Sequence, residues 1–209
     1  KLLGEGAYGK TYLVETKKKK KYAIKYQTLN DYIPFDDTYE LDDKKNKLKE
    51  INKEAVLMTQ ASKLGIGPKI YDKYYCSKDN NFNVFFVMEY LEGGTLSDYL
   101  NNGNKLTESM KKELKNKVKI MHKNGIYHQD LHENNLMLRL RKNKDPEIMI
   151  GDYGLSKNVE QMSKKLIEED YFFINTIFNK SRFKEYKEID YTHLAIKIMI
   201  VNKLVKYKL

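Results

Sequence analysis

Two short polar runs in the second half of the chain constrain its fold and chemistry most. The first is His-Gln-Asp-Leu-His-Glu-Asn-Asn at 128–135, and the second is Asp-Tyr-Gly at 152–154. One carboxylate can orient a hydroxyl nucleophile, while an amide and a second carboxylate can hold Mg²⁺ on the phosphates of ATP. The two runs therefore predict a phosphoryl-transfer site in which Asp130 orients the acceptor and Asn135 and Asp152 bind the metal.

Two further motifs lie upstream, in the order that such a site requires. The first, Gly4, Gly6 and Gly9, forms a Gly-x-Gly-x-x-Gly turn, and glycines let backbone N–H groups approach phosphates closely. A dinucleotide-binding unit would need a helix directly after this turn. Residues 10–14 (Lys-Thr-Tyr-Leu-Val) instead predict a strand, so a flap over ATP is favoured, with an ordinary glycine-rich hairpin as the alternative.

The second upstream motif places Lys25 within the apolar run Tyr-Ala-Ile-Lys-Tyr at 22–26. A buried lysine needs an anionic partner, and this one can meet the α- and β-phosphates of ATP together with a carboxylate from the next helix. Glu54 is the preferred carboxylate because it lies beside the apolar stripe of that helix. Glu50, one turn earlier on the same face, is the alternative.

Hydrophobic pattern and turn residues divide the rest of the chain into short elements. Thr95 and Thr107 are expected to cap two helices, and Asn124-Gly125 is expected to end the second. A break at 92–94 marks a boundary between two lobes. The full prediction is three strands within 1–26, an acidic inserted loop over 28–43, a helix over 44–64, strands over 69–76 and 84–90, the two capped helices reaching 100 and 123, strands over 136–140 and 147–150, and mainly helix after 154.

Composition excludes several classes of protein. The chain has 209 residues and one cysteine, Cys76, which predicts an intracellular, cytoplasmic protein without an internal disulfide. No stretch approaches the ~20 apolar residues that span a bilayer, so no membrane contact is expected. The net charge of +10 predicts a solvated, lysine-rich surface, and no basic stretch forms a recognised nucleic-acid motif.

Together these motifs resemble the eukaryotic-type protein kinases, over residues 1 to about 157. The resemblance implies an α+β, two-lobed fold with ATP in the cleft. The N-lobe, an antiparallel sheet plus one helix, would cover 1–91, and a mainly helical C-lobe, reduced or truncated, would cover 92–209. In that family Lys25 binds phosphate, Glu54, His128 and Asp170 support the site, Met88 is the gatekeeper and 89–91 is the hinge. The implied ATP-binding residues are Gly4, Glu5, Gly6, Ala7, Gly9, Thr11, Ala23, Lys25, Met88, Glu89, Leu91 and Met137.

Four departures from the family pattern change what is expected. Gln129 replaces an arginine that often grips a phosphorylated activation loop, so activity is expected not to depend on such phosphorylation. His132 replaces a lysine that contacts the transferring phosphate, and it can act as a donor only when protonated. Tyr153 replaces phenylalanine. No Ala-Pro-Glu follows Gly154, and Asp170 resembles the start of the helix that anchors the catalytic loop, which leaves a short activation segment.

The function predicted from these residues is transfer of the γ-phosphoryl group of Mg-ATP to a protein hydroxyl, with serine or threonine favoured as acceptor. The partners expected are ATP, a protein substrate of unknown identity and, as an open alternative, a regulatory protein. Two other functions remain open at this point. His-x-Asp-Leu-His-x-x-Asn at 128–135 is also typical of small-molecule kinases of the aminoglycoside and choline type. Gln129, His132 and the short C-lobe would also suit a nucleotide-binding regulator without useful catalysis.

Overall fold

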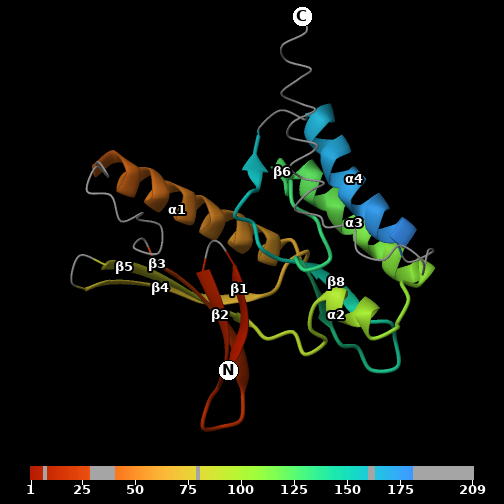
Figure 1. Cartoon of the computed structure of the whole chain (residues 1–209), viewed down its shortest axis with the longest axis horizontal. Helices are drawn as coiled ribbons and strands as arrows, with labels where there is room; N and C mark the ends of the chain where they lie inside the picture. The colour runs from red at the N-terminus through yellow and green to blue at the C-terminus, as the bar shows by residue number, and fades with distance from the viewer. Residues whose placement is uncertain (7–8, 29–40, 79–80, 160–162, 181–209) are drawn as a thin grey trace, which may run out of the picture.

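The computed structural model describes residues 1–6, 9–28, 41–78, 81–159 and 163–180. The acidic stretch over 29–40 and the segment after 180 lie outside the described residues, so the predicted loop and most of the predicted C-terminal helix are not placed. Figure 1 shows a sheet with one long helix across it and, beside this unit, a second unit that is mainly helical. Within the described residues, no helix is both long enough and apolar enough to cross a membrane.

A five-stranded antiparallel sheet in the order β1-β2-β3-β5-β4 forms the first unit. Burial alternates along β3, where Ala23, Lys25 and Gln27 are buried and the residues between them are half-buried. This period of two places alternate side chains on one face of a strand. The strands are β1 (Leu2–Gly6), β2 (Gly9–Glu15), β3 (Lys21–Thr28), β4 (Ile70–Lys78) and β5 (Asn81–Glu89).

Helix α1 (Leu41–Lys63) lies across one face of this sheet (Figure 1). Its buried residues recur at three- and four-residue steps, as an amphipathic helix requires, and they join the same core as Val84 and Phe86 of β5. The core residues of α1 are Ile51, Ala55, Leu57, Met58 and Ala61. Because Glu54 lies within this buried stripe, the helix carries one carboxylate into the interior.

The second unit is built around helix α3 (Glu108–Lys123), whose apolar residues at three- and four-residue steps are buried together with Leu106 just before the helix. These helical residues are Met110, Leu114, Val118 and Met121. Thr107 caps this helix, and Thr95 caps α2 (Leu96–Asn101) in a reciprocal arrangement with Asp98. The helix α4 (Lys164–Lys180) lies beside α3 in Figure 1. The short strands are β6 (Ile126–Tyr127), β7 (Leu136–Arg139), β8 (Glu147–Ile150) and β9 (Lys157–Asn158), paired as β6-β9 and β7-β8.

Several predicted boundaries were wrong by a few residues. Helix α1 begins at Leu41 rather than 44, because the acidic residues at 42–43 resembled a continuation of the loop. Strand β5 begins at Asn81 rather than 84, because Asn81 and Asn83 resembled part of the polar turn. Strands β6 and β9 were missed, since two-residue strands carry no periodicity. Asp170 lies in the second turn of α4 rather than at its start, which is Lys164.

A half-buried ionic cluster ties α3 to the β7-β8 hairpin. Glu147, whose side chain is 17% exposed, accepts hydrogen bonds from Lys117 at 2.7 Å and from Arg139 at 3.0 Å, and Arg141 lies 3.1 Å away. Burial alone would raise the pKa of Glu147, but its cationic partners, with Lys117 the strongest, outweigh burial and lower this pKa to about 2.

We expect the Glu147→Gln variant to lose about 2 kcal/mol of stability at pH 7, because Lys117 then keeps its charge in a buried site without its closest carboxylate. A carboxyl group with a lowered pKa stabilises the fold above its unfolded pKa of about 4.5, and that contribution disappears as the pH falls toward 2. Thermal unfolding measured from pH 7 to pH 2 should therefore decline less steeply in the variant. If the melting temperatures of the wild type and the variant fell equally as the pH was lowered, the assigned role of Glu147 would be contradicted.

Candidate active site

Lys25 is the point at which three elements meet. Its ammonium group donates to Glu54 Oε1 of α1 at 2.5 Å and to Asp152 Oδ1, which follows β8, at 3.1 Å. Lys25 and Glu54 are 8% and 4% exposed, whereas Glu50 is exposed, so the structure pairs Lys25 with Glu54. Burial lowers the pKa of Lys25, but the two carboxylates outweigh burial and hold the pKa above its ordinary value, so the lysine remains a cation.

Gln27 adds a contact to this pair that the sequence did not reveal. Its amide donates to Glu54 Oε2 at 2.8 Å, so both oxygens of Glu54 are bonded and the carboxylate is fixed in orientation. The available signal was spacing: Gln27 follows Lys25 by two residues and therefore shares its face of β3. A polar residue at a buried strand position needs such a partner.

Asp152 holds an unusual backbone conformation and keeps its side chain partly exposed. Its φ is +57°, a region that non-glycine residues rarely adopt, and its side chain is 44% exposed. The next residue, Tyr153, is buried and packs against the His128 ring at 5.1 Å. Burial raises the pKa of Asp152, but the nearby charge of Lys25 outweighs it and lowers the pKa, so the carboxylate is ionised at neutral pH.

Asp130 and Asn135 lie side by side in the loop between β6 and β7. The Asn135 amide donates to both the backbone oxygen and Oδ2 of Asp130, each at 2.9 Å. Because both amide hydrogens are used on Asp130, the amide oxygen is the atom of Asn135 that suits a hard cation. His132 Nε2 lies 3.4 Å from Asp130 Oδ2, and its Nδ1 accepts from the Asn134 N–H at 3.2 Å.

Asp170 of α4 holds the first residues of this loop from beneath. Its fully buried carboxylate accepts from the backbone N–H of His128 at 2.9 Å and of Gln129 at 2.7 Å, and His122 Nε2 lies 2.9 Å away. Gln129 has a φ of +67°, so these bonds fix a strained turn. Its side chain donates to the Leu166 carbonyl at 3.2 Å, back toward α4.

His128 is fully buried beneath the same loop. Its Nε2 lies 2.9 Å from the Gly151 carbonyl and therefore carries the hydrogen that it donates there. Burial lowers the pKa of His128, so the ring is neutral. The residue thus joins the loop to the backbone next to Asp152.

Several of the ATP-binding residues that the family resemblance implies come from both units. Ala23, Met88 and Leu91 are buried, and Thr11 and Met137 are half-buried. In the sheet register, Ala23 is opposite Met88, which brings two of these residues together on neighbouring strands.

The side chain of Glu89 in the predicted hinge is fully engaged. It accepts from Arg139 at 2.8 and 2.6 Å and from the Lys69 N–H at 3.1 Å. The Glu89 backbone is bonded to the same neighbour, because its N–H donates to the Lys69 carbonyl at 2.8 Å. Arg139 was missed by sequence reasoning, because nothing in its spacing indicates a partner on β5.

The glycine-rich turn is described only in part. Gly9 has a φ of +138°, and a Cβ atom there would lie 2.2 Å from the Tyr26 carbonyl, so only glycine fits. A Cβ on Gly4 would meet nothing within 4 Å. Glu5 is exposed and forms an ion pair with Lys10 at 3.0 Å, and Gly6 ends β1. Ala7 lies outside the described residues.

The fold and the site together define a protein kinase domain. Residues 1–183 match the family model of the protein kinase domain. The chain is 32% identical over 160 residues to protein kinase C of Aspergillus fumigatus, 31% over 169 residues to serine/threonine-protein kinase atg1 of Dictyostelium discoideum, and 30% over 163 residues to serine/threonine-protein kinase RIM15 of Saccharomyces cerevisiae. These matches cover 75%, 78% and 75% of this chain.

The chain therefore belongs to the protein kinase family. The comparisons favour this interpretation over the small-molecule kinases. The matched region spans 13%, 24% and 8% of the three relatives, so the chain corresponds to a small part of each.

Proposed function

We propose that this domain transfers the γ-phosphoryl group of Mg-ATP to a serine or threonine hydroxyl of a protein. The observation that supports this proposal best is the position of Lys25, which contacts Glu54 on one side and Asp152 on the other. An ion pair of this kind holds a cation at a defined place in the cleft, so little rearrangement is needed when ATP binds. The N-lobe would cover 1–91 and the C-lobe 92–209.

Each polar residue of the site has a role in this reaction. Lys25 binds the phosphates of ATP. Asp152 and Asn135 are the residues that would hold Mg²⁺, which neutralises charge on the phosphates. Asp130 orients the acceptor hydroxyl and receives its proton as the new phosphorus–oxygen bond forms and the bond to ADP breaks. Gly4, Gly6 and Gly9 cover the phosphates, and Thr11, Ala23 and Met137 enclose the adenine.

A transfer assay with radiolabelled ATP tests the proposal. The purified chain is incubated with Mg²⁺ and a mixture of generic proteins, and the Asp130→Asn variant serves as its matched control. We expect label on protein with the wild-type chain, at least a hundredfold less with the variant, and phosphoserine or phosphothreonine after acid hydrolysis. ATP binding by calorimetry without any transfer would contradict the proposal and favour a regulatory nucleotide-binding protein.

The pH dependence of transfer should report on His132. Its hydrogen bond to Asp130 outweighs burial and raises the pKa of the imidazole above 6.5. A group with a raised pKa keeps its proton at low pH and loses it as the pH rises through that pKa. We expect kcat to fall about tenfold above this pKa, because the ring no longer donates to the transferring phosphate.

The His132→Lys variant should lack this fall, since lysine stays charged to about pH 10. The His132→Ala variant should be slow at every pH. An unchanged wild-type profile in His132→Ala would show that another group titrates.

Phosphatase treatment should leave activity unchanged within about twofold. The Gln129 side chain donates to the Leu166 carbonyl of α4, and an amide carries no charge with which to grip a phosphate. The measurement is the initial rate of transfer before and after treatment, with complete dephosphorylation verified by mass spectrometry. Loss of activity after treatment would contradict this expectation.

A further inference from the structure

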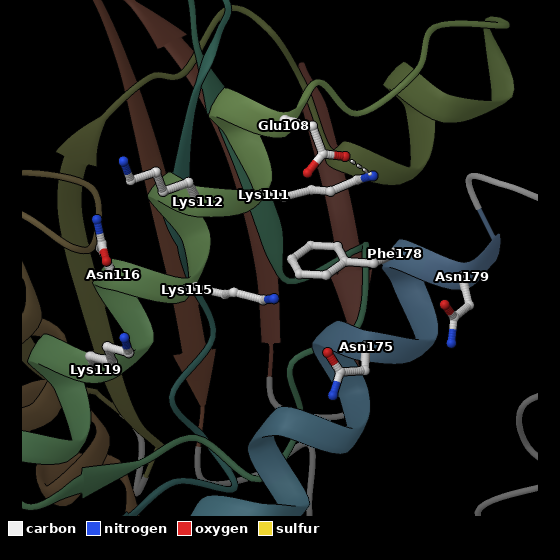
Figure 2. Close-up of a pocket in the computed structure, with 9 residues that line it drawn as sticks. All are labelled: Glu108, Lys111, Lys112, Lys115, Asn116, Lys119, Asn175, Phe178 and Asn179. Atoms are coloured by element: carbon white, nitrogen blue, oxygen red, sulfur yellow. Dashed lines mark hydrogen bonds and ion pairs between the residues drawn. The ribbon is translucent and has the colours of Figure 1, made fainter.

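A groove between α3 and α4 carries a surplus of positive charge that the proposed chemistry does not use. Figure 2 shows lysines of α3 on one side of this groove and asparagines of α4 on the other. The groove has a volume of about 610 Å³, and its lining includes four lysines and one glutamate. The lysines are Lys111, Lys112, Lys115 and Lys119.

The stability of α3 does not explain this clustering. Lys111, Lys115 and Lys119 follow one another at four-residue steps, and like charges at this spacing destabilise a helix by about 0.2–0.5 kcal/mol per pair. Lys111 is paired with Glu108 at 2.7 Å. Lys115 and Lys119 are both exposed. Within the described part of the chain, neither of them forms an ion pair. An anionic ligand would relieve this repulsion.

The other wall of the groove supplies neutral hydrogen-bonding groups over an apolar floor. Asn175 and Asn179 of α4 are exposed one turn apart, and their amides can bond to a peptide backbone. Phe178 is 8% exposed, and the Lys115 ammonium lies 5.4 Å from its ring centre. The ammonium of Lys115 thus lies in the groove over the Phe178 ring of α4 (Figure 2).

The spacing of the lysines matches an extended acidic peptide. Four helical residues rise about 6 Å, and alternate side chains of an extended chain lie about 6.6 Å apart. Three carboxylates at alternating positions can therefore face Lys111, Lys115 and Lys119 in turn. Single-stranded nucleic acid is less suitable, because it binds through exposed aromatic rings, and the Phe178 ring is covered.

We propose that the α3-α4 groove binds an extended acidic segment of the protein substrate and so selects substrates for the domain. This inference rests on the proposed kinase function. Phe178 lies eight residues beyond Asp170, which contacts the catalytic loop, so the groove is about 12 Å along α4 from that contact.

Binding is measured first, without catalysis. A fluorescent peptide with glutamate at four alternating positions, separated by serine, is titrated with the full chain and followed by anisotropy. We expect saturable binding that weakens as salt rises from about 50 to about 300 mM, and at least fivefold weaker binding to the Lys115→Gln/Lys119→Gln variant. The matched control is Lys17→Gln/Lys18→Gln, which removes the same charge from the exposed β2-β3 turn and should bind like the wild type.

Equal binding by both double variants would overturn the proposal, because the interaction would then depend on net charge alone. Equal binding of a peptide with glutamine in place of glutamate would overturn it as well. A single-stranded oligonucleotide of the same charge should bind more weakly than the peptide. If the oligonucleotide bound more tightly than the peptide, and the groove variant lost this affinity, the ligand of the groove would be nucleic acid. That result would also overturn the proposal.

Transfer is measured second, on an acceptor peptide joined to the acidic segment by a flexible linker of about ten residues. The acidic segment should lower KM at least fivefold without changing kcat, and the groove variant should lose this gain while keeping kcat on the unlinked acceptor. If the acidic peptide bound to the groove but no phosphoryl transfer occurred, the result would contradict the kinase function and not the binding role of the groove. Transfer without groove-dependent binding would contradict the groove and not the kinase function.

Discussion

Replacing Asp152 by asparagine is expected to lower the rate of phosphoryl transfer at least a thousandfold. The substitution removes the charge of a proposed Mg²⁺ ligand and leaves Lys25 with one carboxylate partner instead of two. A thousandfold loss corresponds to about 4 kcal/mol of transition-state stabilisation, which is reasonable for a metal ligand in a site whose chemistry is mainly electrostatic. Single-turnover measurements at saturating Mg-ATP isolate this step from ATP binding.

The matched control for this experiment is Glu168→Gln, which removes one negative charge from an exposed position on α4. This variant should transfer phosphate at the wild-type rate. Circular dichroism should show that Asp152→Asn folds normally, since its side chain is 44% exposed and not part of the core. Activity within tenfold of the wild type in Asp152→Asn would contradict the metal-binding role.

Replacing Asp170 by asparagine is expected to damage both stability and transfer. The two carboxylate oxygens accept from the backbone N–H groups of His128 and Gln129, whereas an amide can accept on one side only. The NH₂ group of the amide would then face one of these backbone N–H groups, so that two donors would meet in a fully buried site. The expected loss is about 3 kcal/mol of folding free energy, seen as a lower midpoint in urea unfolding.

The rate of transfer should fall by more than the fraction of unfolded protein explains. Gln129 keeps its left-handed backbone only while Asp170 holds the turn, and Asp130 is the next residue along the chain. We therefore expect at least a hundredfold lower kcat, measured at a temperature where the variant is fully folded. Glu169→Gln, next to Asp170 but half-buried, is the control and should change neither quantity appreciably. A folded Asp170→Asn protein with wild-type kcat would show that the loop does not need this contact.

Much of the fold was predictable because local rules decide it. Thr95 and Thr107 cap helices as predicted, since the hydroxyl of a threonine satisfies N–H groups only a few residues away. The buried stripe of α3 followed directly from its helical period. The β6-β9 pair could not be predicted, because two-residue strands form only when the chain brings 126–127 and 157–158 together.

The ionic contacts of the site also divide into those that could be predicted from the sequence and those that depend on the folded chain. Lys25 could be recognised as a residue that needs an anion, and Glu54 was chosen over Glu50 from its place beside an apolar stripe. The bond from Gln27 and the grip of Arg139 on Glu89 were not predicted. Each of them depends on the distance between side chains of different elements, which residue spacing alone does not give.

Local motifs were enough to identify the residues that could carry the chemistry, because Asp130, Asn135 and Asp152 stand in short runs of characteristic spacing. How these residues meet depends on the folded chain. Packing of α1 on the sheet brings Glu54 to Lys25, and the fully buried carboxylate of Asp170 holds the loop that carries Asp130. The difference lies in the sequence separation over which each interaction acts. Capping, periodicity and turn preferences act over a few residues, whereas a buried charge requires a partner that only the folded chain supplies.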